Sequence, residues 1–119
     1  MNIIKIKKGV CNMFLEKYLS PVYLDIVYNN YDNEYLKLLD EANFNEVYNL
    51  LKRYGFYFIY DIIIDYIELF NIDSKYVAKA ILDIKTLLGD DYIKKIGNNM
   101  VIINKIIEFA CKYCDEKLV

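Results

Sequence analysis

The sequence predicts an all-α protein, a single compact bundle of about six to seven helices over residues 1–119, built around a central apolar helix at residues 56–70. Three observations lead to this fold class. The chain has four Gly and one Pro among 119 residues, which are few breaks for a loop-rich β-sandwich. Its hydrophobic content of 56 % is enough to fill one core. Apolar residues recur at helical spacing between capping residues.

The capping residues set the expected helix boundaries. Residues 2–8 suit either a short strand or a first helical turn, and residues 10–19 suit a helix. Ser20-Pro21 ends that helix and begins the next, since Ser is a common N-cap and Pro fits the first helical position. The remaining ranges expected to be helical are 21–28, 33–41, 43–54, 56–70, 74–88, 90–96 and 99–116.

Two of these helices have explicit start and stop signals. Asn43 with Glu46 three residues later resembles a capping box, and Gly55 stands at the C-terminal stop position of the same helix. Asp73-Ser74 caps the helix that Gly89 closes. Short connections between such helices are typical of all-α bundles.

The central segment is the most apolar part of the chain. Residues 54–70 read YGFYFIYDIIIDYIELF, and β-formers are frequent in them. Asp61, Asp65 and Glu68 fall at i, i+4 and i+7, which places them on one face of a helix. A helix that is apolar around most of its circumference belongs in a core. We therefore expect a buried central helix with one narrow acidic stripe at the surface.

Charge is distributed unevenly along the chain. Ten acids in residues 25–73 stand against Lys37, Lys52 and Arg53, a net charge of −7, and the same range holds eight of the 13 tyrosines. Phosphate contacts need clustered Lys or Arg, so this composition argues against direct nucleic-acid binding. The lysines Lys5, Lys7 and Lys8 are expected to be a solvated end.

The sequence offers little for catalysis. It contains no His, so Ser-His and Cys-His pairs are excluded, and Arg53 alone cannot form a phosphate clamp of several arginines. Asp61, Asp65 and Glu68 could bind a hard cation, but we expect an exposed stripe. We predict no enzyme, no catalytic residues, no metal site and no cofactor.

The cysteines and the apolar runs bear on location. Three Cys without a secretory signal indicate a reducing, cytoplasmic compartment, and we find no apolar run long enough to cross a membrane. Cys111 and Cys114 form a C-x-x-C. Zinc would need two further ligands, for which only Cys11 and carboxylates remain. We expect the two thiols to be core or half-buried groups that extend the apolar face of residues 99–114.

Tyrosines interleaved with acids supply the leading functional hypothesis. Tyr side chains give large, rigid contact area and are enriched in interfaces. The hypothesis is a non-enzymatic inhibitor that blocks a basic surface of another protein, in the manner of immunity proteins or of phage and viral inhibitors of host defence. The residues predicted to bind the partner are Tyr28, Tyr31, Asp32, Glu34, Tyr35, Tyr57, Asp61, Asp65 and Glu68.

Two alternatives remain in other classes. A central apolar helix among about seven in a chain this short is similar to the compact Bcl-2-like proteins of poxviruses. Leu51-Lys52-Arg53-Tyr54-Gly55 lies about where that family has its Gly-containing motif, in which Gly precedes Arg, so the resemblance covers topology only. It implies a groove for a partner helix. A homo-oligomeric structural subunit, for example a homodimer, would instead pair the apolar face of residues 99–114 with its own copy. For an enzyme, the deciding feature would be a divalent ion at Asp61, Asp65 and Glu68.

Overall fold

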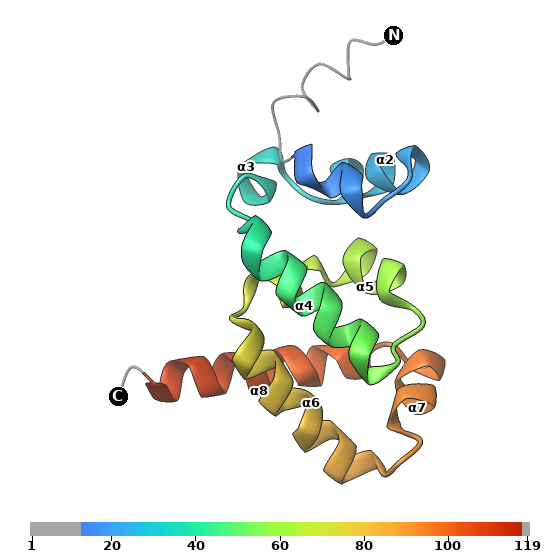
Figure 1. Cartoon of the computed structure of the whole chain (residues 1–119), viewed down its shortest axis with the longest axis vertical. Coiled ribbons are helices and arrows are strands. Elements are labelled where there is room, and N and C mark those ends of the chain that lie inside the picture. The colour runs from blue at the N-terminus through green and yellow to red at the C-terminus, as the bar shows by residue number, and fades with distance from the viewer. Residues whose placement is uncertain (1–12, 118–119) are drawn as a thin grey trace, which may run out of the picture.

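The computed structural model describes residues 13–117, which form an all-α bundle with no strand among them (Figure 1). This confirms the predicted fold class. The predictions for residues 2–8 and Cys11 lie outside the described residues. The elements in chain order are the 3₁₀ helix η1 (Met13–Lys17), α2 (Pro21–Asn30), α3 (Asn33–Leu36), α4 (Glu41–Tyr54), α5 (Ile59–Asp65), the 3₁₀ helix η2 (Ile67–Asn71), α6 (Ser74–Leu88), α7 (Tyr92–Asn98) and α8 (Ile102–Lys117).

Several predicted boundaries are confirmed. Pro21 occupies the first turn of α2. Gly55 and Gly89 follow α4 and α6 with φ of 91° and 98°, a backbone region that glycine adopts without steric cost. Asp73 caps α6, because its carboxylate accepts a hydrogen bond from the backbone N–H of Lys75 at 3.0 Å. Glycine and cap signals therefore located these helix ends from the sequence.

The predicted capping box at Asn43 is wrong, and Asn43 has a different role. The N-cap of α4 is Asp40, whose carboxylate accepts from the backbone N–H of Ala42 at 2.9 Å. The Asn43 amide group instead donates to the carbonyl oxygens of Phe70 at 2.9 Å and Ile72 at 2.7 Å. Its oxygen accepts from the Ser74 N–H at 3.1 Å. Asn43 thus fixes the connection from η2 into α6.

The predicted single helix at residues 56–70 is interrupted at both ends. Helix α5 begins at Ile59, and Tyr66 (φ −139°, ψ 45°) separates it from η2. One straight helix could not turn all of the segment's apolar side chains to the same side. With the two breaks, eight of them are buried, as predicted for a central segment: Phe56, Phe58, Ile59, Ile62, Ile63, Ile67, Leu69 and Phe70.

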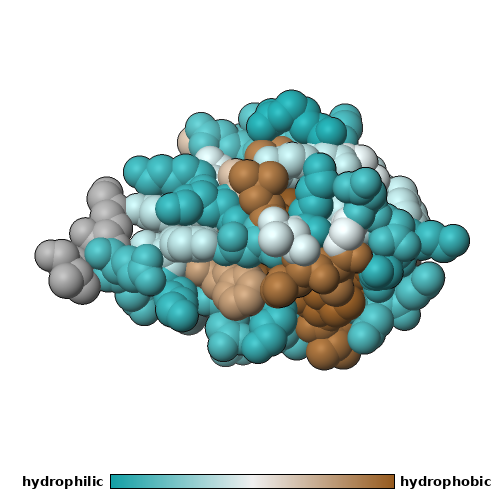
Figure 2. Space-filling view, turned by 90° about the horizontal axis from the view of Figure 1, so that it is seen from below, coloured by the Kyte–Doolittle hydropathy of each residue, from teal (hydrophilic) through white to brown (hydrophobic). Residues whose placement is uncertain are grey.

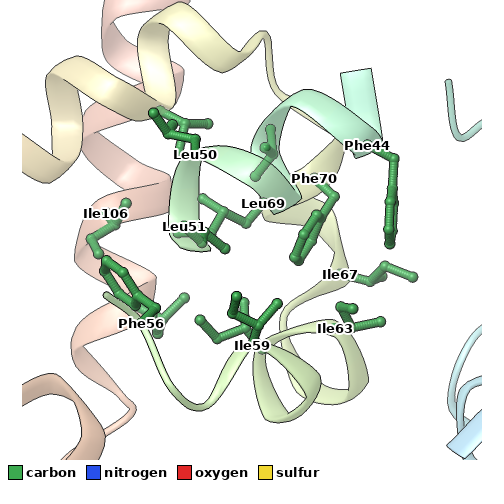
Figure 3. Packing of buried hydrophobic residues seen from close by; sticks show 14 of the residues in the cluster. Phe44, Leu50, Leu51, Phe56, Ile59, Ile63, Ile67, Leu69, Phe70 and Ile106 are labelled. Atoms are coloured by element: carbon green, nitrogen blue, oxygen red, sulfur yellow. The ribbon is translucent and has the colours of Figure 1, made fainter. Parts of the chain in front are cut away.

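The core lies between α4, the central segment and α8 (Figure 3). Phe44 of α4 and Phe70 of η2 stack with ring centroids 4.6 Å apart, and both are fully buried. Ile106 of α8 is also fully buried and reaches this core from the opposite side. The same apolar cluster therefore supports the upper and lower parts of the bundle in Figure 1.

Helices α6 and α8 form the most extensive helix pair in the described chain. The Tyr113 hydroxyl of α8 donates to the Asp83 carboxylate of α6. The ammonium of Lys79 lies 4.4 Å from the centroid of the Tyr113 ring, close enough for a cation–π contact. The pair is thus held by polar contacts at its edge as well as by buried Ile103, Ile106 and Ala110.

Candidate functional site: an acidic surface on α2–α3 and α5–η2

Two stretches without any Lys or Arg pack against each other. One runs from residue 18 to 36 and the other from residue 54 to 74. They form α2–α3 and α5–η2, and α2 packs on α5, as the neighbouring ribbons in the upper half of Figure 1 show. We call the exposed part of residues 18–36 and 54–71 the acidic surface, because every charged side chain in it is a carboxylate.

Most of these carboxylates have no cation beside them. Asp32, Asp61, Asp65 and Glu68 are exposed, and no ion pair within the described range involves them. Glu34 differs, because Lys37 lies 3.7 Å away. Asp61 and Asp65 share one face of α5, as predicted, whereas the break at Tyr66 places Glu68 in η2. The predicted acidic stripe is therefore divided between α5 and η2 and does not lie along one helix.

Tyr31 and Tyr35 lie at the η2 end of the acidic surface. Their rings stack at 6.1 Å between centroids, and the Tyr31 hydroxyl accepts a hydrogen bond from the Ile67 N–H at 3.3 Å. Burial raises the pKa of Tyr31, and the charges of Glu68 and Asp65 raise it further. Burial also raises the pKa of Tyr35, and the negative charge of Glu68 raises it further by a smaller amount. The structure thus brings together four of the predicted binding residues from α2–α3 and α5–η2.

A second pair of tyrosines marks the other end of the α2–α5 contact. Tyr23 of α2 and Tyr60 of α5 stack at 5.8 Å with 20° between their planes. They are 38 % and 45 % exposed, so one face of this aromatic pair is open to a partner. The set of predicted binding residues did not include them. Their pairing depends on how α2 meets α5, which spacing within either helix does not reveal.

Two predicted binding tyrosines lie apart from this arrangement. Tyr28 is half-buried against the core, and its hydroxyl oxygen is buried. Tyr57 is 71 % exposed, but its hydroxyl lies over Gly97 of α7, where an added Cβ would stand 2.5 Å from it. Tyr28 therefore supports the acidic surface from beneath, and Tyr57 faces α7.

The prediction that Cys111 and Cys114 are core or half-buried is wrong. Both thiols are free and exposed. Only part of the predicted apolar face of α8 is covered by the bundle: Ile103, Ile106 and Ala110 are buried, whereas Ile102 and Ile107 are half-buried. The covered residues fill the contact with α6, and the stripe that carries the cysteines turns away from it.

Apolar side chains also reach the surface on the underside of the bundle. Figure 2 shows them gathered on the face that α6, α7 and α8 form at the bottom of Figure 1. The most exposed apolar residues in these elements and the turn before α8 are Leu82, Leu87 and Val101. On the acidic surface the exposed rings carry hydroxyl groups, and Val22 of α2 is the strongly exposed aliphatic side chain there.

The described residues contain no group of three His, Cys, Asp or Glu side chains placed to hold a metal ion. No helix within residues 13–117 has the length and apolar character needed to span a membrane. Comparison of the chain with protein-family models, with curated proteins and with solved structures returns no match.

Proposed function

We propose that this protein is a non-enzymatic inhibitor that binds a basic surface of another protein through its acidic surface. The proposal rests on one observation: α2 packs on α5, two helices from segments free of Lys and Arg, and four carboxylates of these segments are exposed without an ion pair in the described range. They are Asp32, Asp61, Asp65 and Glu68. Complementary charge accelerates encounter and selects partners. An ordinary solvated surface mixes both signs of charge.

The tyrosines would supply affinity once charge has brought the partner close. Tyr23 and Tyr60 are already stacked on each other, and Tyr31 is already held by the Ile67 N–H. Rings that are ordered before binding lose less conformational entropy on association. Lys or Arg side chains of a partner could lie on the open ring faces as cation–π contacts while their charges meet Asp61, Asp65 or Glu68.

The hollow between α4 and α6 gives the groove hypothesis little support. Its volume is about 410 Å³, and five of the seven residues that line it are polar or charged: Glu46, Asn49, Leu50, Arg53, Ser74, Lys75 and Ala78. A groove that accepts the apolar face of a helix needs a predominantly hydrophobic lining. The acidic surface is therefore the site we carry forward.

Affinity capture with a salt step tests the proposal. Tagged protein would be incubated with extract from cells that encode it, and separately with extract from a competing strain or an infected host. We expect one basic protein at stoichiometric yield, released by raised salt because screening weakens charge attraction. Recovery of the protein alone, as a salt-resistant oligomer, would contradict the proposal and favour the homo-oligomeric alternative.

A further inference from the structure

The two exposed thiols of α8 are spaced so that both could bind one metal ion. Cys111 and Cys114 lie three residues apart, so they share one face of the helix, and both are solvent-exposed. Neither packs in the core. Structural zinc sites use four ligands in a tetrahedron, and a set of four cysteine thiolates is a common form. One chain offers two such ligands here, with no third metal-ligating side chain grouped with them among the described residues.

We propose that Cys111 and Cys114 from two copies of this chain bind one zinc ion between paired α8 helices. Two copies related by a two-fold axis present the same surface to each other, so they would bring four thiolates to one place. The second copy is therefore a part of the site. This site is separate from the acidic surface on α2–α3 and α5–η2.

The surroundings of the two thiols fit a second α8 helix. Asn104, Ile107, Cys111 and Cys114 follow one another at intervals of three, four and three residues, the spacing of the contact positions in paired helices. None of the four is charged, and none is fully buried within one chain. The last turns of α8 extend beyond α6 in Figure 1.

This stripe is too short to hold a dimer without metal. Stable helix pairing through heptads is expected from three or four repeats, whereas the stripe covers fewer than two. Metal binding supplies free energy to assemblies that are not stable alone. Dimerisation through α8 should therefore depend on zinc.

Helix geometry favours a metal over a disulfide within one chain. Side chains at i and i+3 of a helix have Cβ atoms about 5–6 Å apart, while a disulfide needs about 3.5–4.5 Å. Two Zn–S bonds of about 2.3 Å each span the larger separation without unwinding α8.

The test measures metal stoichiometry and oligomeric state together. Reduced, metal-free protein would be titrated with ZnCl₂, and its mass followed by size-exclusion chromatography with light scattering. We expect a monomer in chelator, a dimer with zinc, and one zinc per two chains. Cobalt chloride in place of zinc should give the intense visible absorption of a tetrahedral thiolate complex.

Three variants test whether Cys111 and Cys114 are the zinc ligands. Cys111→Ser and Cys114→Ser should each abolish the zinc-dependent dimer and the cobalt absorption while the helical circular dichroism stays unchanged. Cys11→Ser is the matched control and should retain both. One zinc per monomer, loss of binding in Cys11→Ser, or a dimer that forms in chelator would each overturn the proposal.

Discussion

The upper and lower halves of the bundle both contain ion pairs, among them Lys17–Glu41 and Lys37–Glu34 in the upper half, but three acids of the acidic surface differ from two acids at α7 and α8 in their neighbours. Asp91, the N-cap of α7, lies 3.4 Å from Lys95, and Glu108 of α8 lies 3.0 Å from Lys105. On the acidic surface, Asp61, Asp65 and Glu68 have no such neighbour within the described chain. Both halves share one core and comparable helices. Acids with and without a cationic neighbour therefore occur on the same fold, so folding does not require every surface acid to be paired.

The largest expected effect comes from breaking the core beneath the acidic surface. Phe70 is fully buried and stacks on Phe44, so Phe70→Ala should lower the free energy of unfolding by about 3–5 kcal/mol. Urea denaturation followed by circular dichroism measures it. Leu87→Ala, at a position 68 % exposed in the lower half, is the control and should change stability by less than about 0.5 kcal/mol. Equal losses would show that the core is not where we place it.

A smaller loss of stability should follow when the hydrogen bonds that hold the connection from η2 into α6 are removed. Asn43→Ala removes three hydrogen bonds to Phe70, Ile72 and Ser74. Unmade bonds of partly buried backbone groups cost about 1–3 kcal/mol each, less where water replaces them, so we expect a total loss of about 2–4 kcal/mol in urea denaturation. The control is Asn49→Ala, at an exposed position on the same helix, which should leave the free energy of unfolding nearly unchanged. If Asn43→Ala also leaves it unchanged, Asn43 does not stabilise the connection between the halves.

Alkaline pH should act on the acidic surface through Tyr31. Burial, Glu68 and Asp65 raise its pKa in the folded state, so the folded state favours the neutral phenol. That contribution is fully present below the unfolded tyrosine pKa of about 10 and is lost as pH rises through the higher folded value. As pH rises through this window, Tyr31→Phe should therefore lose less stability than the wild type, measured by urea denaturation at each pH. Parallel pH profiles would contradict this assignment.

The smallest expected effect is a change in stability when one acid is neutralised, with opposite signs for Asp65 in the upper half and Glu108 in the lower half. Asp65→Asn removes an acid that has no ion pair in the described range and that follows Asp61 by four residues on α5, so stability should rise by a few tenths of a kcal/mol. Glu108→Gln removes the partner of Lys105 and should lower it by a similar amount. Thermal melts at low salt compare the two, and salt at about 1 M should erase most of the contrast. If both substitutions changed stability in the same direction, the ion pair of Glu108 and the absence of one at Asp65 would not explain their effects.

The sequence predicted the fold class well because its evidence was local. Apolar spacing, Gly55, Gly89 and the Asp73 cap each depend on residues within a turn or two. The break at Tyr66 and the role of Asn43 were missed because both depend on distant partners. Asn43 bonds to residues 27 to 31 positions away. No local pattern distinguishes such an Asn from a cap.

In the candidate site, too, features that depend on local sequence were predictable and features that depend on contacts between distant elements were not. Acidic bias and tyrosine content were visible in the sequence, and helical spacing placed Asp61 and Asp65 on one exposed face, whereas Glu68 is exposed from η2. The Tyr23–Tyr60 stack was not predictable, because it forms only where α2 meets α5. Burial of the Tyr28 hydroxyl and exposure of Cys111 and Cys114 depend on how far the neighbouring elements extend.

The most direct test of the central claim reverses one charge in each half. Wild-type, Glu68→Lys and Asp90→Lys proteins would serve as baits in parallel captures from the same extract. Glu68 and Asp90 are both exposed, and both substitutions change the net charge equally. We predict that Asp90→Lys recovers the basic partner as the wild type does, and that Glu68→Lys recovers about tenfold less or none. Equal recovery by the two variants would contradict the acidic surface as the binding site.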